Sequence, residues 1–423
     1  MNESAESAAL RGFDPHTQAF AQDPYPIYAA MREQRAPLYY APFDTWLVSR
    51  YVDVQRLATA ATMQRTRGDW CSQQERDTLL KADNWHDMPF HSRFIQTSLL
   101  DSDGEVHDRL RRQVFMFFAP GPIAGLREAV GVYVNQLLDE LLGHNAQFDF
   151  IEDLAAHLPG RMIGRLMGVP DADCALLRQW SERIVQFFDI DRSAEKKALA
   201  EATTIEFYEY LKDLARSRAQ RPADDLITKL LQAQSAEKIT EDEFYSTCML
   251  IVMAGHGSTL DALGSGLHSL LRFPAQLSRL QQDSSLVKTA VQEMLRFESP
   301  LPFFHRYNAQ AIELGGRSFP IGTRFGLLYG AANRDSERFT APDTFNIGRR
   351  PNRHLALGGG AHFCLGNHLA KLNMEVLFER LVQRTSHIAL AGGEHNELLY
   401  KPGLSARGLQ RLPIEVKSRT IGG

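Results

Sequence analysis

The sequence predicts a mainly α-helical protein with a small β region, folded as one large domain. Helical spacing of apolar residues dominates the stretch 105–272. Short strand patterns occur near residues 38–49 and in the last quarter of the chain. The 423 residues contain no low-complexity run, no internal repeat and no linker-like stretch. We therefore expect a tail over residues 1–20 and a single domain over residues 21–420.

Composition narrows the classes of function. The net charge of −4 shows no basic excess, which argues against a nucleic-acid partner. The cysteines lack the spacings of a disulfide framework, as is typical of a reducing cytosol. They are Cys71, Cys174, Cys248 and Cys364. Because Met1–Ser7 is polar and acidic, we expect neither a signal peptide nor a membrane anchor, and a cytoplasmic protein.

The N-terminal quarter alternates helix and strand. Residues 24–35 begin with prolines that favour a helix start, and residues 51–61 form a second helical pattern. Between them, residues 38–40 and 45–49 predict a small hairpin. Residues 62–100 have scattered charge and poor periodicity, so we expect a long irregular region there.

Helices dominate from residue 105 onward. The expected ranges are 105–118, 120–143, 150–168, 171–190, 194–219 and 223–234. Gly168 and Pro170 give the third of them a clear end. Short strands are expected near 311–319, 324–328, 387–390 and 409–417.

One predicted helix, residues 241–272, is unusually long and would span about 48 Å. Thr240 and Glu243 form a capping box at its start, and Pro274 ends it. Its apolar run, residues 249–254, is too short to span a membrane.

Two glycines, Gly255 and Gly257, lie at the middle of this long helix. Each costs about 1 kcal/mol relative to alanine in a helix. A helix that is weakened at its midpoint usually has a packing or functional reason.

Cys364 lies in the glycine-rich run 357–366, whose backbone can bend sharply. Residues 367–380 follow with a helical pattern, so the cysteine lies at the N-terminal end of a helix. The helix dipole and free amides there favour a thiolate. A thiolate near amide donors is a ligand for a soft metal centre.

Two other interpretations of this loop are open. Cys364 can be a buried cysteine in a glycine-rich turn. Alternatively, Cys364 can bind zinc together with His354, His362 and His368, although such a site requires more cysteines or a paired second half, which the sequence lacks.

The loop resembles the haem-binding loop of the cytochromes P450, which reads Phe-Gly-x-Gly-x-His-x-Cys-x-Gly. The matching residues are Gly358, Gly360, His362, Cys364 and Gly366, whereas Leu357 replaces the usual phenylalanine. The resemblance extends over nearly the whole chain, from about residue 20 to residue 417. It implies a soluble, bacterial haem-thiolate monooxygenase with the single triangular, haem-enclosing domain of that family. It also implies one haem b held by Cys364, and redox tuning that differs slightly because the shielding phenylalanine is absent.

The segment 254–259 is similar to the family's distal-helix signature, Ala-Gly-x-(Asp/Glu)-Thr. In the family this helix crosses the haem where dioxygen binds, and the acid and alcohol supply protons. Here Gly257 occupies the position of the acid, and Ser258, followed by Thr259, occupies that of the alcohol. Proton delivery therefore requires another source.

Three hypotheses account for the reaction without an acid at position 257. Asp261, one helical turn after Gly257, can supply protons through water, or it can be a structural ion pair. A polar group of the substrate can order the water instead. The third hypothesis is chemistry without ordinary oxygen activation, such as oxidative coupling or peroxide-driven oxidation. His256 is offset by about 100° on the helix, so we expect a structural role for it.

Glu293 and Arg296 match the family's Glu-x-x-Arg pair, and the spacing places both on one helical face. Arg349, at the end of Phe345–Arg349, is the third expected partner. A glutamate between two arginines forms a charge-assisted network, which the resemblance assigns to fixing the haem loop.

The two haem propionates require cations. His107 and Arg111 resemble the family's His-x-x-x-Arg, with both residues on one helix face. Arg306 and His354 match the other usual propionate contacts. Each of the four taken alone would more often be a solvated charge, but together they follow the family's order.

Electrons must come from another protein, because the chain carries no flavin, nicotinamide or iron–sulfur fingerprint. The resemblance implies a ferredoxin and a ferredoxin reductase, which draws on NAD(P)H. Arg109, Arg112, His362 and Lys371 are candidates for steering an acidic ferredoxin, or they are ordinary surface charges.

The resemblance also implies a largely apolar substrate pocket. Its candidate residues are Phe187, Phe188, Ile251, Ala254, Gly255, Leu301, Phe303, Phe304 and Leu404. The alternative for each is core packing.

The implied reaction inserts one atom of O2 into a small organic molecule in secondary-metabolite biosynthesis, by a monomeric enzyme. Catabolism of xenobiotics or terpenes stays open. The rivals are oxidative coupling, peroxide-driven oxidation and a haem-based sensor or binding protein.

Overall fold

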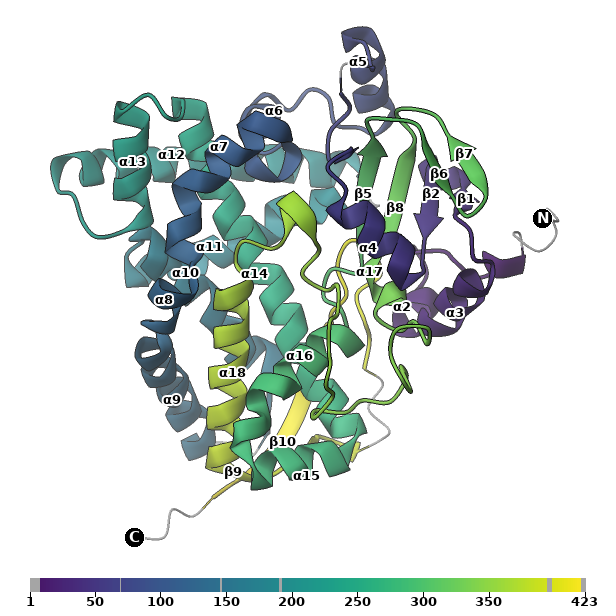
Figure 1. The fold of residues 1–423 in the computed structure, drawn as a ribbon. Coiled ribbons are helices and arrows are strands. Elements are labelled where there is room, and N and C mark those ends of the chain that lie inside the picture. Colours follow the sequence, from purple (N-terminus) through teal and green to yellow (C-terminus); the bar gives the residue numbers. More distant parts are fainter. Residues whose placement is uncertain (1–7, 69, 145–146, 190–191, 394–397, 420–423) are drawn as a thin grey trace.

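The computed structural model describes residues 8–68, 70–144, 147–189, 192–393 and 398–419. The first seven residues of the predicted tail and residue 420 lie outside this part of the chain. Helices make up most of the molecule, and the largest sheet lies at one side of them (Figure 1). Among the described residues, no helix is both long enough and apolar enough to cross a lipid bilayer.

The helical part is organised around α14 (Glu241–Arg272), which runs through its middle (Figure 1). The bounds of α14 agree with the prediction, because Thr240 and Glu243 form the expected capping box. Its main neighbours are α10 (His157–Met167), α11 (Cys174–Val185), α16 (Val287–Phe297) and α18 (Asn367–Arg384). Most residues of α14 are buried, so this helix is the core of the fold.

The other helices surround this core or cover the sheet. They are α2 (Gln18–Gln22), α3 (Tyr25–Glu33), α4 (Tyr51–Thr59), α5 (Gln73–Ala82), α6 (Pro89–Phe94), α7 (Gly104–Phe115), α8 (Pro120–Ala124), α9 (Arg127–His144), α12 (Ala194–Gln220), α13 (Leu226–Ser235), α15 (Pro274–Gln282) and α17 (Tyr329–Ala332).

The main sheet has five strands in the order β1-β2-β8-β5-β3. They are β1 (Leu38–Tyr40), β2 (Thr45–Val48), β8 (Arg324–Leu328), β5 (Phe303–Asn308) and β3 (Met63–Gln64). Only the β2–β8 pair is parallel. A second sheet contains β4 (Gln147–Asp149), β10 (Pro413–Ser418) and β9 (Thr385–Leu390), and β6 (Ile312–Leu314) pairs with β7 (Arg317–Phe319).

The prediction of an irregular region over residues 62–100 is wrong, because this region contains β3 and the helices α5 and α6. Helix α5 escaped prediction because none of its residues is buried, so it has no apolar stripe. Instead, Ser72 and Glu75 form a capping box that stabilises its first turn.

Several other boundaries differ from the predictions. The helix expected over 120–143 is divided into α8 and α9, and the one expected over 150–168 starts with a π-helical turn, Phe150–Ala155. Strand β5 was not predicted, although it carries three candidate site residues. Within the expected N-terminal tail, Phe13 and Phe20 are buried in a core cluster with β1 and β2.

Candidate functional site

The glycine-rich loop holds Cys364 just before α18. The amide of Cys364 donates a hydrogen bond to the carbonyl oxygen of Leu357 at 2.9 Å, which closes the loop. Gly358 and Gly360 adopt φ values of +71° and +66°, a conformation that favours glycine. A Cβ on Gly360 would lie 2.7 Å from the carbonyl oxygen of Ala58 on α4. Glycine is therefore required for the loop to approach α4 so closely.

The environment of the Cys364 thiol contains opposing influences. Burial raises its pKa, whereas the amide of Gly366 and the cations Arg111 and Lys371 lower it. The amide favours the thiolate as predicted and the cations add to it, but burial is the larger influence, so the pKa of the thiol lies above its ordinary value, contrary to the expected preference for the thiolate. A metal cation at the sulfur would supply the remaining charge that a thiolate needs.

Two basic residues of α7, His107 and Arg111, contact the cysteine loop. The buried ring of His107 lies 4.4 Å from the ring of His362, measured between centroids. Arg111 donates a hydrogen bond to the carbonyl oxygen of Phe363 at 2.6 Å, so it joins α7 to the cysteine loop. His362 Nε2 lies 3.2 Å from Asp103 Oδ1. These contacts bring together residues that the sequence placed more than 250 positions apart.

Asp103 is an acid beside these residues that the sequence did not point to. Burial alone would raise its pKa, but hydrogen bonds from His362, from the amides of Arg65 and Thr66 and from the Thr66 hydroxyl lower it well below the usual range. Asp103 is therefore a carboxylate at neutral pH.

Arg306 is buried on β5 and has no carboxylate partner within ion-pair distance among the described residues. Its Nη1 donates to the carbonyl oxygen of His305 at 2.8 Å. Burial lowers its pKa to about 10, so the guanidinium is still charged at neutral pH. A buried cation without an anion is costly, and an anionic ligand group would offset that cost.

Sequence reasoning missed a second buried arginine, Arg65. Its Nη2 lies 2.7 Å from Asp101 Oδ1, and its Nη1 donates to the carbonyl oxygen of His305 at 3.1 Å. Arg65 follows β3 directly and shares the carbonyl oxygen of His305 with Arg306, so the two guanidinium groups are neighbours. A two-residue strand such as β3 leaves no periodic pattern that could have revealed this neighbour.

The remaining propionate candidate, His354, contacts α16 instead. Its Nε2 lies 3.0 Å from Gln292 Oε1, and burial lowers its pKa to about 3. A propionate contact of His354 stays a prediction. Within the described residues, no three His, Cys, Asp or Glu side chains gather closely enough to hold a metal ion, so the four residues of the zinc interpretation form no such group.

The middle of α14 has an open face. Ala254 is exposed and Gly257 and Ser258 are half-buried, although the helix on both sides of them is buried. A Cβ on Gly257 would meet no atom within 4 Å. In contrast, a Cβ on Gly255 would lie 1.9 Å from Cδ1 of Ile163 on α10. Gly255, a predicted substrate contact, thus faces the packed interface with α10, and Gly257 faces open space.

The two hydroxyls at this point bind the helix backbone. Ser258 Oγ donates to the carbonyl oxygen of Ala254 at 3.2 Å, and Thr259 Oγ1 donates to that of Gly255 at 3.4 Å. Ser258 therefore lies at the open face, whereas Thr259 is buried.

Asp261 is buried and forms an ion pair with Lys401, with Nζ 2.9 Å from Oδ1. The structural ion pair that the sequence left open is therefore present. Burial raises the pKa of Asp261 and Lys401 opposes this rise. His256 is buried on the opposite side of α14, against Gly160 of α10, and burial lowers its pKa to about 4.

These features fit a haem. The loop presents one half-buried thiol, the nearby cations include a buried arginine without a carboxylate partner among the described residues, and the middle of α14 leaves open space beside Gly257. Helix α18, which follows the thiol, packs against α14 (Figure 1). A soft ligand, cations for two carboxylates and room for a flat group are what a haem requires.

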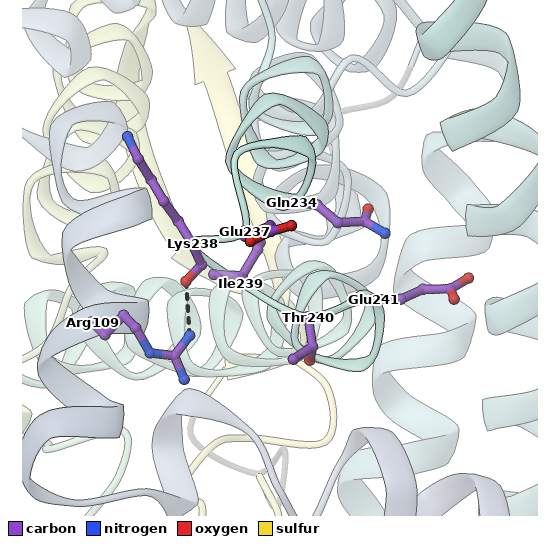
Figure 2. A pocket seen from close by; sticks show the side chains of 7 residues that line it. All are labelled: Arg109, Gln234, Glu237, Lys238, Ile239, Thr240 and Glu241. Atoms are coloured by element: carbon purple, nitrogen blue, oxygen red, sulfur yellow. Dashed lines mark hydrogen bonds between the residues drawn. The ribbon is translucent and has the colours of Figure 1, made fainter.

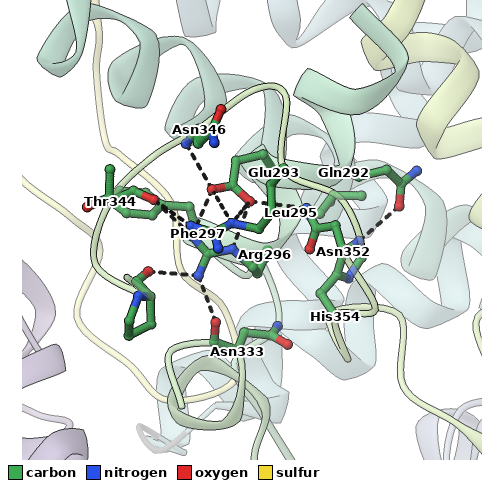
Figure 3. A network of polar contacts seen from close by, with 12 residues as sticks. Gln292, Glu293, Leu295, Arg296, Phe297, Asn333, Thr344, Asn346, Asn352 and His354 are labelled. Atoms are coloured by element: carbon green, nitrogen blue, oxygen red, sulfur yellow. Dashed lines mark hydrogen bonds and ion pairs between the residues drawn. The ribbon is translucent and has the colours of Figure 1, made fainter. Parts of the chain in front are cut away.

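The three residues of the predicted triad contact one another. Glu293 binds Arg296 through two contacts of 2.8 Å (Figure 3). Glu293 also binds Arg349, whose Nε lies 3.1 Å from both carboxylate oxygens. Asn352 and the amide of Asn346 also donate to Glu293. Arg296 donates further to the carbonyl oxygens of segment 333–344 that precedes the loop. The network therefore fixes the chain that leads into the cysteine loop.

The candidates for partner docking differ in their contacts. Arg109 forms two contacts of 2.6 and 2.9 Å with Glu243 and donates to the carbonyl oxygen of Lys238 at 2.9 Å. Arg109 and Lys238 are among the residues that line a surface depression of about 460 Å³ (Figure 2). Arg112, by contrast, is exposed, and Phe115 and Met116 beside it are among the most exposed large apolar side chains.

The candidate substrate residues lie in several environments. Phe187, Ile251 and Leu404 are buried in apolar clusters, whereas Phe188 is half-buried. Leu301, Phe303 and Phe304 are half-buried at or near β5. The ring of Phe304 lies 5.3 Å from the guanidinium of Arg65, which places Phe304 beside one of the two buried arginines.

Comparison with known proteins agrees with this geometry. The family description "Cytochrome P450" matches residues 181–409. The chain is 34% identical to "Cytochrome P450 107B1" of Saccharopolyspora erythraea, over 97% of this chain and 98% of the relative. It is 31% identical to the "Polyketide biosynthesis cytochrome P450 PksS" of Bacillus subtilis, over 96% and 98%. The crystal structure of P450BioI in complex with hexadec-9Z-enoic acid ligated acyl carrier protein superposes with a TM-score of 0.85, at 30% identity, over 94% of this chain and all of that one.

The thiol loop, the Glu293 network and similarity over nearly the full length lead to one conclusion: the chain belongs to the cytochrome P450 family and is an oxidoreductase of the haem-dependent monooxygenase type.

Proposed function

We propose that this enzyme inserts one atom of O2 into a small, largely apolar organic molecule in secondary-metabolite biosynthesis, as a cytoplasmic monomer. The observation that carries the proposal is the half-buried Cys364 thiol on its glycine-rich loop, near the cations Arg111 and Lys371. The name of the polyketide-biosynthesis relative supports the biosynthetic role.

The haem would be held by residues already described. Cys364 would be its metal ligand, with Gly358, Gly366 and His362 shaping the loop. The haem propionates would lie near Arg306, Arg65, His107 and Arg111, and His354 is a further candidate. When bound, the haem supplies oxygen activation, which the electron-rich thiolate promotes.

Two residues of α14 set the conditions for proton delivery. Gly257 leaves room for water at the open face, and Ser258 presents a hydroxyl there. Asp261 supports the first of the three proton hypotheses, because its partner Lys401 is 45% exposed and reaches solvent. Burial raises the pKa of Asp261 and the ion pair with Lys401 opposes this rise, so the carboxyl group takes up a proton more readily than an exposed aspartate does.

Gly257→Glu tests whether proton supply limits the reaction. If it does, the share of consumed electrons that appears in product rises and hydrogen peroxide release falls. An unchanged share would favour substrate-assisted delivery or chemistry that needs no such proton.

We infer that a ferredoxin delivers the electrons, which a reductase takes from NAD(P)H. One exposed surface combines the positive charge of Arg112 with the apolar side chains of Phe115 and Met116. A partner protein with acidic and apolar side chains would be complementary to this surface. Arg111, the neighbour of Arg112 on α7, donates to the carbonyl oxygen of Phe363, so the helix that carries Arg112 contacts the cysteine loop. The internal ion pair of Arg109 with Glu243 makes that residue a weaker candidate than Arg112.

Reconstitution separates the possible reactions. The proposal predicts product from NAD(P)H, reductase, ferredoxin and O2 together, and little product from hydrogen peroxide alone. Product with peroxide alone would favour the peroxide-driven alternative, and dimeric products would favour oxidative coupling. Failure of a panel of apolar compounds to change the haem spin state, with no turnover, would favour a haem-based sensor.

A further inference from the structure

His91 on α6 is a buried histidine with an unused hydrogen-bonding nitrogen. Its side chain is 0% exposed. Nε2 has no hydrogen-bond partner among the described residues and is fully covered by protein atoms. A buried polar group without a partner is costly, so each such group requires an explanation.

Gln96 decides which ring nitrogen of His91 carries the proton. Gln96 Nε2 lies 3.3 Å from His91 Nδ1 and 3.3 Å from the carbonyl oxygen of Trp85. Because a carbonyl oxygen can only accept, the group facing it is the amino group of Gln96, which donates to both neighbours. Nδ1 of His91 is therefore an acceptor, and in a neutral imidazole the proton lies on Nε2. Burial lowers the pKa of His91 to about 4, so the ring is neutral at physiological pH.

The donor is held rigidly. The backbone amides of Phe90 and His91 both donate to the carboxylate of Glu201 on α12, each at 2.9 Å. This contact fixes the first turn of α6 to α12, and Gln96 fixes the imidazole. A donor whose position is fixed before a ligand binds loses little entropy on binding.

Aromatic rings surround the imidazole. The ring centroid of Trp85 lies 5.3 Å away, and those of Phe187 and Phe188 lie 5.9 Å away. None of these side chains offers an oxygen acceptor. The guanidinium of Arg192 lies 5.1 Å from the ring centroid of Trp85. The His91 cluster, defined as His91, Trp85, Phe187 and Phe188, thus holds one unpartnered N–H donor in aromatic surroundings.

We propose that the Nε2–H group of His91 is a substrate-recognition donor, which binds the oxygen of a carbonyl, carboxyl or hydroxyl group on an otherwise apolar substrate. The proposal rests on the monooxygenase function, and it narrows the substrate class to apolar molecules with an acceptor oxygen remote from the oxidised carbon. The aromatic side chains contact the apolar body. An analogue without the oxygen leaves the buried N–H unsatisfied, so the site should discriminate strongly against that analogue.

Three probes and three variants test this inference on the haem-loaded protein. The probes are hexadec-9Z-enoic acid, the corresponding alcohol and the corresponding hydrocarbon, whose affinities are measured by equilibrium dialysis. His91→Phe removes the donor and keeps a ring, and His91→Gln keeps an N–H donor. His268→Phe is the matched control, because burial also lowers the pKa of His268 to about 4, and its partner is Tyr400, outside the cluster.

We expect wild-type protein to bind the acid and the alcohol about tenfold more tightly than the hydrocarbon, as one hydrogen bond allows. His91→Phe should lose this preference without weaker hydrocarbon binding, His91→Gln should recover part of it, and His268→Phe should keep it. The nitrogen-15 resonance of His91 Nε2, recorded in the diamagnetic reduced carbon monoxide form, should shift when the acid or alcohol binds.

Retention of the preference in His91→Phe would overturn the inference, and so would an Nε2 resonance that responds to none of the three probes. Circular dichroism and haem content show whether each variant is folded. The failure of the proposed function is distinguishable, because it would appear as a missing thiolate–haem spectrum in wild-type protein, whatever His91 does.

Discussion

Replacement of Arg296 by leucine removes the centre of the network in Figure 3. Glu293 and Arg296 are both 0% exposed, so neither can exchange its partner for water. The change deletes two charge-assisted bonds to Glu293 and leaves the buried carbonyl oxygen of Asn333 and the partly buried one of Pro342 without their donor. Breaking a buried ion pair costs about 3–5 kcal/mol. Two charge-assisted hydrogen bonds at about 1.5–3 kcal/mol each give a similar value.

The measurement is the free energy of unfolding in urea, together with the haem content of purified protein. Arg216→Leu is the control, because Arg216 pairs with Asp213 on α12 and the two side chains are 64% and 74% exposed. An exposed pair contributes at most about 1 kcal/mol. Arg296→Leu should therefore lose several times more stability than the control, and should also lose haem because the segment before the cysteine loop is released.

The reasoning would be refuted if Arg296→Leu lost no more stability than Arg216→Leu. Normal stability with reduced haem content would instead show that the network acts on the loop alone.

Three further predictions concern single side chains. Gly255→Ala should destabilise the protein by about 1–3 kcal/mol, because the added Cβ meets Ile163. Gly257→Ala, whose Cβ meets no atom, should instead stabilise the helix by up to about 1 kcal/mol. Equal effects of the two changes on the free energy of unfolding in urea would contradict this. Burial lowers the pKa of His256 from 6.5 in the unfolded chain to about 4 in the folded protein. Between these two pH values the unfolded chain is protonated at His256 and the folded protein is not. The free energy of unfolding therefore falls as the pH is lowered from 6.5 to 4, by up to about 1.4 kcal/mol per pH unit. His256→Leu should flatten unfolding free energy against pH in that window, and an unchanged slope would show that His256 is protonated in the fold. Arg112→Glu should raise the ferredoxin concentration that half-saturates reduction, mostly at low salt, with no change in the carbon monoxide spectrum.

Sequence patterns predicted the features that depend on local chemistry. The ends of α14 followed from the capping box at Thr240 and from Pro274, and the position of Cys364 before α18 followed from the helical pattern after it. Helix α5 was missed because an exposed helix has no apolar stripe. In the N-terminal quarter, Arg65 is a neighbour of Arg306 because both arginines donate to the carbonyl oxygen of His305, which no sequence pattern indicates.

Contacts between distant parts of the chain were beyond sequence reasoning. Lys401 lies 140 positions from its partner Asp261, and His362 lies 259 positions from Asp103. No spacing rule connects such residues, because the fold brings them together. The same applies to Gly255 and Gly257, which look alike in sequence but face a packed helix and open space.

The most direct test of haem ligation by Cys364 is the absorption spectrum of the reduced protein under carbon monoxide. Freshly prepared, haem-loaded wild-type protein should show the strongly red-shifted band of a thiolate opposite the bound gas, and Cys364→His should show the band of a nitrogen ligand. A wild-type spectrum of the nitrogen-ligand type would contradict the central claim that this sulfur holds the iron.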